Sequence, residues 1–248
     1  MSSESQRPRL PLALWLLFPL SIVPVQMLAK AIGEDFYQRT MRGELGLIEN
    51  LTVLSLAVAV GCAVVLFMRR DLVDCKYFGR FALVMALGCF FFAGEEASWG
   101  QHWLGFTPPD SIAARNDQGE FNLHNDPFLE TFLDQLPRLL LTLAALGGGI
   151  IAPIVRRKRG LRHPSFRGPS IWGWIWPSFV CMPAAILVVT VSLPKKVFRL
   201  LDQPQPYYLD ISPGETKELG LALFLMIYLL TLVVELGTAS RLEPKEAA

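Results

Sequence analysis

The sequence predicts an all-α fold, a polytopic membrane helical bundle with about six transmembrane helices and a short amphipathic helix on the outer surface. Of its 248 residues, 52% are hydrophobic and only 18% are charged, and the mean hydropathy is +0.38. A soluble domain would carry charge on about a quarter of its residues. The apolar residues also fall in long blocks, each near the ~20 residues needed to cross a hydrocarbon core. No polar stretch is long enough to form a soluble domain, so one integral membrane domain is predicted.

The first three predicted spans cover residues 10–28, 47–68 and 77–94, and the third could extend to residue 103. The first span follows two arginines, and Leu28-Ala29-Lys30-Ala31 resembles a cleavage site. A removed signal peptide is therefore the alternative to a retained helix. A retained helix is favoured, because the apolar stretch is longer than a usual signal-peptide core and contains Pro19 and Pro24.

The last three predicted spans cover residues 137–155, 171–193 and 219–237. Gly147-Gly148-Gly149 in the fourth span permits close helix packing. Pro177 and Pro183 predict a kink in the fifth. Between residues 129 and 136, apolar side chains form a stripe opposite two acids, which predicts the short amphipathic helix on the outer surface.

The distribution of Lys and Arg predicts the orientation of the chain. Basic residues are concentrated in cytoplasmic loops of membrane proteins. With the N-terminus inside, the inner segments hold 14 of the 23 Lys and Arg residues, and the run Arg156-Arg157-Lys158-Arg159 lies among them. The prediction is a bacterial inner (cytoplasmic) membrane protein with both termini in the cytoplasm. This orientation places 16 of the 22 acids on the outer side.

Glu95 and Glu96 stand side by side near the outer end of the third span. A charged acid at mid-bilayer costs roughly 2.5–3.5 kcal/mol, and less near the interface. From Arg80 to Glu95 the helix would rise ~22 Å, which leaves the pair in the outer third of the membrane. If the helix continues, Glu95 shares a face with Ser98, Trp99 and His102, while Glu96 points aside.

The following loop, residues 116–127, carries Glu120 and His124 four positions apart. If the loop is helical, the two side chains share a face and suit a metal. With Glu95 or Glu96 they would supply three or four ligands, and carboxylate and imidazole groups suit zinc, iron or manganese. The structural alternatives are turn-forming Asn, Asp and Gly, a hydrogen-bonded interfacial His124, and an Asp126-Pro127 helix start. His102 could simply face the periplasm.

Other outer acids lie at the starts of helices. Glu49 lies within the apolar register of the second span, and Glu215 and Glu218 open the sixth. A capping box at Ser212 explains Glu215, and first-turn acids favour the helix dipole. The predicted catalytic residues are Glu95, Glu96, Glu120 and His124, with Glu96, Glu120 and His124 as the metal ligands. The predicted substrate-binding residues are Ser98, Trp99, Gln101, Asn122, Asn125, Glu49 and Glu218.

The run Glu95-Glu96-Ala97-Ser98-Trp99-Gly100-Gln101, followed by Gln118-Gly119-Glu120-Phe121-Asn122-Leu123-His124-Asn125, resembles the signature of a bacterial family. That family consists of uncharacterised multi-pass inner-membrane proteins. The resemblance covers about 30 residues. It implies a membrane protein and names no reaction.

Three hypotheses about function follow. The first is a membrane-embedded, metal-dependent enzyme, a hydrolase or transferase, acting on a lipid or lipid-linked substrate at the outer leaflet. The second is a non-catalytic subunit or assembly factor, in which Glu95 and Glu96 pair with a basic partner helix, Arg115 or Arg138. The third is a proton- or cation-coupled transporter.

Predicted partners are the lipid bilayer, a lipid substrate, and a second copy or another membrane protein. Nucleic acid is not expected, since the net charge is +1. The four cysteines lack the spacing of a zinc site or disulfide framework.

Overall fold

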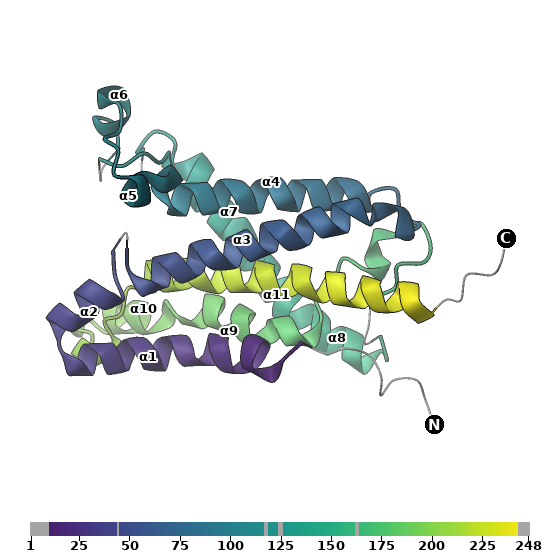
Figure 1. The fold of residues 1–248 in the computed structure, drawn as a ribbon. Helices are drawn as coiled ribbons and strands as arrows, with labels where there is room; N and C mark the ends of the chain where they lie inside the picture. Colours follow the sequence, from purple (N-terminus) through teal and green to yellow (C-terminus); the bar gives the residue numbers. More distant parts are fainter. Residues whose placement is uncertain (1–9, 44, 117–118, 124–125, 162–163, 243–248) are drawn as a thin grey trace.

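A computed structural model describes residues 10–43, 45–116, 119–123, 126–161 and 164–242. The predicted all-α fold is confirmed: these residues form helices and connecting segments without a strand. Six helices are long and apolar enough to cross a membrane (Figure 1). They cover residues Ala13–Ile32, Leu47–Met68, Phe78–Glu96, Thr131–Lys158, Phe179–Leu200 and Tyr207–Ala239.

The spans are made of both continuous and interrupted helices. Continuous ones are α3 (Leu47–Met68), α4 (Phe78–Glu96) and α11 (Pro213–Leu242). The first span joins η2 (Ala13–Leu17) to α1 (Phe18–Ile32). The fourth runs through η5 (Thr131–Gln135), α7 (Leu136–Ala144), η6 (Ala145–Ile151) and α8 (Ala152–Lys158). The fifth contains η8 (Phe179–Cys181), α9 (Met182–Thr190) and α10 (Leu193–Leu200).

Short helical segments connect these spans. They are α2 (Glu34–Thr40), η3 (Arg70–Leu72), η4 (Ser98–Gly100), α5 (Gln101–Leu104), α6 (Asp110–Ala113), η7 (Ile171–Gly173) and η9 (Tyr207–Leu209).

The central helix of the bundle is α11, which packs against α3 and α9. Leu219, Leu223 and Ile227 on α11 are fully buried, as are Leu56 and Ala63 on α3. All these side chains belong to one core cluster. A helix that is apolar around its whole circumference is expected at the centre of a bundle.

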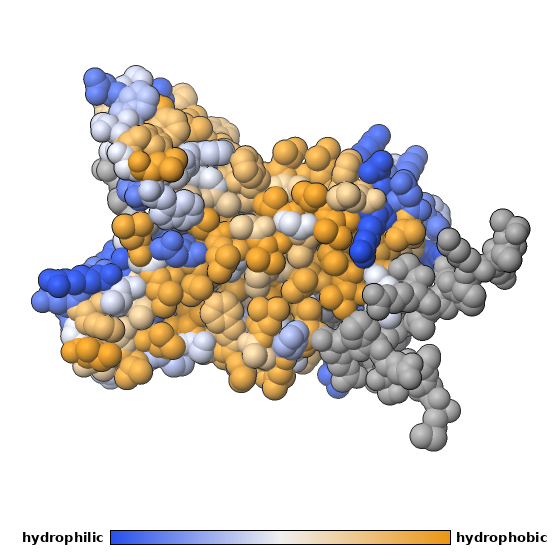
Figure 2. All heavy atoms as spheres, viewed as in Figure 1, coloured by the Kyte–Doolittle hydropathy of each residue, from blue (hydrophilic) through white to orange (hydrophobic). Residues whose placement is uncertain are grey.

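Figure 2 shows a broad hydrophobic region across the middle of the visible face, with hydrophilic residues gathered at both ends; we call this region the hydrophobic belt. We call the end where α4 ends and α3 and α11 begin the cavity end. The opposite end carries Arg156–Arg159 at the close of the fourth span, and we call it the basic end. The start of the first span and the last turns of α11 both lie at the basic end (Figure 1).

The fourth and fifth spans differ from their predicted bounds. Residues 131–136 form the first turns of the fourth span instead of a separate surface helix. The fifth span begins at Phe179, eight residues later than predicted. Pro183 lies in the first turn of α9, where proline is tolerated, so it causes no kink there. The helix is instead interrupted at residues 191–192, just before Pro194 in the first turn of α10.

The third span ends at Glu96, and the predicted extension to residue 103 is wrong. Ser98, Trp99 and Gly100 all have positive φ angles, of 42°, 50° and 86°. This left-handed backbone turns the chain away from the axis of α4. The expectation that Glu95, Ser98, Trp99 and His102 share one helical face is therefore wrong as well. The described residues between 97 and 130, which we call the 97–130 segment, instead lie at the cavity end, where Glu120, Asn122 and Glu130 line the cavity.

Candidate functional site

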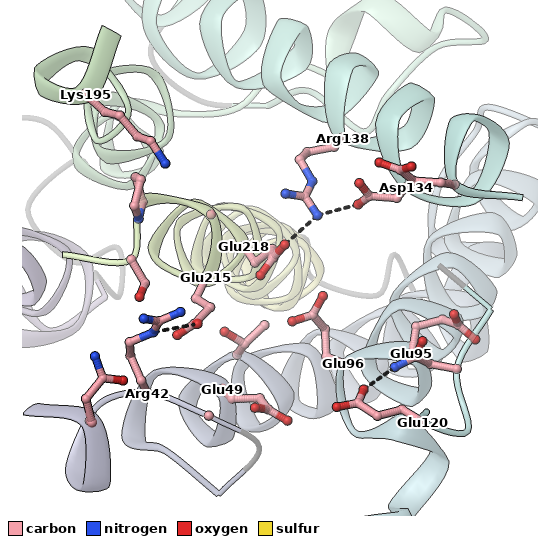
Figure 3. A pocket seen from close by; sticks show the side chains of 18 residues that line it. Arg42, Glu49, Glu95, Glu96, Glu120, Asp134, Arg138, Lys195, Glu215 and Glu218 are labelled. Atoms are coloured by element: carbon pink, nitrogen blue, oxygen red, sulfur yellow. Dashed lines mark hydrogen bonds and ion pairs between the residues drawn. The ribbon is translucent and has the colours of Figure 1, made fainter. Parts of the chain in front are cut away.

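A polar cavity of about 860 Å³ lies at the cavity end of the bundle (Figure 3). It collects side chains from α2, α3, α4, the 97–130 segment, the fourth span, α10 and α11. Eight of them are acids and three are bases, so the cavity carries a negative formal charge. The charged residues are Glu49, Glu95, Glu96, Glu120, Glu130, Asp134, Glu215, Glu218, Arg42, Arg138 and Lys195.

Three carboxyl side chains that the sequence predicted as site residues converge on this cavity from three spans. Glu96 is the last residue of α4, Glu49 lies in the first turn of α3, and Glu218 lies near the start of α11. Figure 3 shows Glu96 pointing into the space between the other two. The Glu96 carboxyl is also close enough to those of Glu49 and Glu218 for their charges to interact. Each residue is only partly exposed, so the three acids share a restricted space.

Arg138 brings a positive charge to these acids. Its guanidinium Nη2 lies 2.5 Å from a carboxylate oxygen of Glu218 and also bonds Asp134, one helical turn earlier. The Arg138 side chain is 27% exposed, and that of Glu218 is 13% exposed. Burial at this level strengthens the attraction between the charges. The two pairs fix the guanidinium beside Glu96.

The edge of the cavity carries two further bases. The Nε of Arg42 lies 3.4 Å from a carboxylate oxygen of Glu215, in the first turn of α11. Lys195 extends from α10 towards the opening (Figure 3). The cavity thus has carboxylates at its centre and basic side chains at its edge.

Glu95 has a different role from its neighbour Glu96. It is only 3% exposed. One carboxylate oxygen accepts a hydrogen bond of 2.7 Å from the Trp99 indole, and the other accepts one of 2.7 Å from the backbone N–H of Leu123. Trp99 itself packs against Gly94, where an added Cβ would lie 2.8 Å from the indole ring. Glu95 therefore ties the 97–130 segment to the end of α4.

Glu120 is the centre of a second group of hydrogen bonds in the same segment. Its carboxylate accepts bonds from the Ser98 hydroxyl, at 2.8 Å, and from the Asn122 side-chain amide, at 2.5 Å. Gln101 accepts a bond of 2.6 Å from the backbone N–H of Phe121. Together with Glu95 and Trp99 these residues form what we call the segment network, defined as Glu95, Ser98, Trp99, Gln101, Glu120 and Asn122. Ser98, Glu120 and Asn122 are buried.

Of the three predicted metal ligands, Glu96 and Glu120 belong to the described residues and His124 does not. Glu120 is not in a helix, so the helical face that it was expected to share with His124 does not begin there. The Nε2 of His102 lies 3.8 Å from Glu120, a pairing that the sequence did not suggest. No group of three or more His, Cys, Asp or Glu side chains suited to a metal occurs among the described residues. His124 and Asn125 lie outside these residues, so a site completed by His124 stays a prediction.

One structural interpretation from the sequence holds. The Asp126 side chain accepts a hydrogen bond of 2.9 Å from the backbone N–H of Phe128, as expected of a residue that caps the start of a helix. Arg115, one of the two arginines suggested as partners of Glu95 and Glu96, instead lies 2.8 Å from Asp126. Of the two arginines proposed as their partners, Arg138 is the one that reaches the cavity.

Sequence reasoning did not place Arg42, Lys195 or Glu215 in the site, and it named Arg138 only as a partner of Glu95 and Glu96 in one hypothesis. Arg138 had a detectable signal, since a single arginine in an apolar span, four residues after Asp134, is costly unless it is paired. Arg42 and Lys195 gave no such signal, because basic residues near the ends of spans are common. Their positions depend on how α2 and α10 fold against the bundle.

Comparisons with protein-family models, with curated proteins and with solved structures found no match to this chain. The resemblance to a bacterial inner-membrane family therefore stays a prediction. The fold and the cavity define the chain as a helical bundle with the composition of a multi-pass membrane protein and a charged cavity at one end.

Proposed function

We propose that this chain is a membrane-embedded enzyme, a hydrolase or transferase, that acts on a lipid or lipid-linked substrate at the outer leaflet. The observation that carries the proposal is the convergence of Glu96, Glu49 and Glu218 from three spans on one cavity that also holds Arg138. Placing a charged acid at this depth costs free energy, so such acids usually have a partner or mark a functional site. The segment network accounts for Glu95 and Glu120, but Glu96 points into the cavity.

Glu96 is suited to act as the general base. It is the acid nearest the centre of the group in Figure 3, with Glu49 on one side and Glu218 on the other. Adjacent carboxylates in a poorly solvated site resist joint ionisation, so one of them can hold a proton and exchange it with a substrate. In this proposal Glu96 takes a proton from the attacking hydroxyl or water.

Arg138 is suited to bind the oxygen on which negative charge develops. A guanidinium fixed in place before reaction needs little rearrangement as that charge appears. Glu218 and Asp134 provide this fixing, because both bond the same guanidinium nitrogen. Arg138 therefore has an orientation set by the protein and not by the substrate.

The location of the cavity favours a lipid or lipid-linked substrate. Glu96 ends one span, and Arg138 lies in the first turns of another, so both are at the border of the hydrophobic belt. A volume of about 860 Å³ lies in the range of small-molecule sites and would hold a polar head group. The acyl part could then remain in the membrane.

The packing beneath the cavity favours an enzyme over a transporter. From Leu219 to Leu229, α11 carries side chains that are buried and apolar apart from the Tyr228 hydroxyl. That hydroxyl donates to the Ile175 carbonyl at 2.7 Å. A path for protons or cations would need polar groups or water through this half of the bundle. The charged side chains of the cavity lie at one end of the bundle, as a one-sided site requires.

The test compares wild type with Glu96→Gln in cells that overproduce each protein, followed by lipid mass spectrometry. Wild type is expected to change the abundance of a lipid species, and Glu96→Gln to abolish that change. Asp110→Asn, an exposed acid in α6 outside the cavity, is the matched control and should behave as wild type. Equal lipid profiles for wild type and Glu96→Gln at equal protein levels would refute the enzyme proposal.

The sidedness of the site belongs to the same proposal, with both termini in the cytoplasm of a bacterial cell. A reporter fused at the C-terminus tests it. A periplasmic enzyme such as alkaline phosphatase should be inactive there, and a cytoplasmic fluorescent protein should be bright. The reverse result would place the cavity at the cytoplasmic face.

A further inference from the structure

A second cavity, of about 850 Å³, lies towards the basic end of the bundle. We call it the apolar groove. It runs between the fourth span, α4, α11 and the chain from Trp172 to Pro177. Its walls are apolar side chains such as Phe81 and Phe224, and Arg156 and Arg159 stand at one end. The proposed enzyme site at the cavity end does not use any of these residues.

The groove exists because the fourth span approaches α9 and α11 unevenly. At Gly149 an added Cβ would lie 2.5 Å from the Ala185 Cβ and 2.7 Å from the Phe224 ring, so the helices are in close contact there. At Gly147, two residues earlier, an added Cβ would meet nothing within 4 Å. Both glycines belong to η6, a π-helical stretch, and such stretches often occur at functional sites. Gly147 thus opens on the groove.

The groove is suited to a hydrocarbon chain. The Tyr228 side chain lines the groove, and its hydroxyl already donates a hydrogen bond of 2.7 Å to the Ile175 carbonyl. Ile151 is 52% exposed and Trp172 is 61% exposed, so the groove reaches the surface of the bundle. An acyl chain that packs closely against these apolar side chains gains dispersion contacts. An acyl chain from the surrounding membrane could enter from the side.

The open end of the groove has the charge and the aromatic rings of a head-group site. Arg156 and Arg159 line it, and Trp172 and Trp176 stack there with ring centroids 5.5 Å apart. Tryptophan is enriched where a bilayer meets water. Basic pockets between spans on the cytoplasmic side bind anionic head groups. The two arginines therefore favour a lipid with negative charge over a zwitterionic one.

The groove is longer than the hydrocarbon part of one leaflet, so it has room for an acyl chain. From Leu141 to Arg159, both of which line it, an α-helix would rise roughly 27 Å. One leaflet of a hydrocarbon core is about half of ~30 Å. We propose that the apolar groove binds one anionic phospholipid, with an acyl chain along Gly147 and the phosphate beside Arg156 and Arg159.

The test is native mass spectrometry of the full-length protein in detergent, titrated with phosphatidylglycerol or phosphatidylcholine of the same acyl composition. Wild type should bind phosphatidylglycerol several-fold more tightly. Each arginine near an anionic surface contributes enough that its loss should weaken binding about five-fold. Arg156→Gln and Arg159→Gln together should remove the preference between the two lipids. Lys158→Gln, in the same basic run but outside the groove, is the matched control and should keep it.

A second variant tests the position of the acyl chain. Gly147→Phe should fill the groove and weaken binding of both lipids, because Gly147 lines the groove and a Cβ added there meets nothing within 4 Å. Gly88 on α4 lies outside the groove, and a Cβ added there also meets nothing within 4 Å, so Gly88→Phe should bind as wild type. The proposal is overturned if the double arginine variant retains the preference for phosphatidylglycerol. Wild-type lipid binding by Gly147→Phe would also overturn it.

Discussion

Replacing Glu95 by Gln should loosen the 97–130 segment, whereas the same replacement at Glu96 should leave that segment in place. The two residues are adjacent and chemically identical, so the pair is its own control. Glu95 accepts two hydrogen bonds, from the Trp99 indole and from the Leu123 backbone N–H, each 2.7 Å long. Glu96 faces the cavity instead (Figure 3).

The size of the effect follows from what Gln can accept. Gln has one acceptor oxygen and one NH₂ group, so one of the two donors would face another donor. A hydrogen bond to a charged group is worth about 1.5–3 kcal/mol, and a buried donor without a partner costs a similar amount. Because Glu95 is only 3% exposed, water cannot readily replace the lost acceptor. A cost of about 2 kcal/mol raises the opening equilibrium about thirty-fold.

The measurement is hydrogen–deuterium exchange at the backbone amides of residues 119–123, read by mass spectrometry. The amides of Glu120, Phe121 and Leu123 donate to the side chains of Asn116, Gln101 and Glu95, so they report directly on the segment. Glu95→Gln should speed their exchange, and Glu96→Gln should not. If the two variants exchange at the same rate as wild type, the assignment of Glu95 to the segment network is refuted.

Three further predictions concern the neighbouring contacts. Gly94→Ala should displace the Trp99 ring, whose atoms would lie 2.8 Å from the new Cβ, and lower stability by about 1–3 kcal/mol in thermal unfolding. Arg138→Leu should destabilise the protein by about 2 kcal/mol, because it leaves the Glu218 carboxylate beside the cavity without its cation, and Glu218→Leu in the same chain should recover part of that loss. Elemental analysis of purified wild type should find zinc, iron or manganese, and His124→Ala should lower its content.

Each of these predictions has an outcome that would contradict it. Gly88→Ala, on the same helix as Gly94 and with space around it, should leave the unfolding temperature unchanged, and an equal loss there would remove the argument from close contact. Additive effects of the Arg138 and Glu218 replacements would show that the two side chains do not interact. A wild-type protein purified without metal would contradict the metal prediction.

The helical spans could be predicted because hydropathy is a local property. Each apolar block of ~20 residues has a favourable transfer free energy by itself, whatever its neighbours are. The second span, residues 47–68, was therefore predicted with its observed bounds, Leu47–Met68. The fifth was predicted to begin at residue 171, but the spanning helix begins at Phe179. In the structure Trp174 is buried against Phe78, with ring centroids 4.9 Å apart, outside the spanning helix.

The different surroundings of Glu95, which bonds the 97–130 segment, and Glu96, which faces the cavity, could not be predicted. Helical periodicity gave each residue a direction only by assuming that α4 continues past Gly100. The positive φ angles at Ser98 and Trp99 end that periodicity, and such angles are uncommon for residues other than glycine. The hydrogen bonds that hold this backbone join residues up to 28 positions apart.

The sequence by itself determined that the chain is an all-α bundle of about six apolar helices, and that two adjacent acids at the end of the third required an explanation. Only the tertiary structure decided that Glu95 holds a connecting segment while Glu96 faces Glu49, Glu218 and Arg138 in a cavity. The physical reason is the range of the interactions. Transfer into a membrane depends on consecutive residues, whereas ion pairs and hydrogen bonds between helices depend on packing that brings distant parts of the chain together.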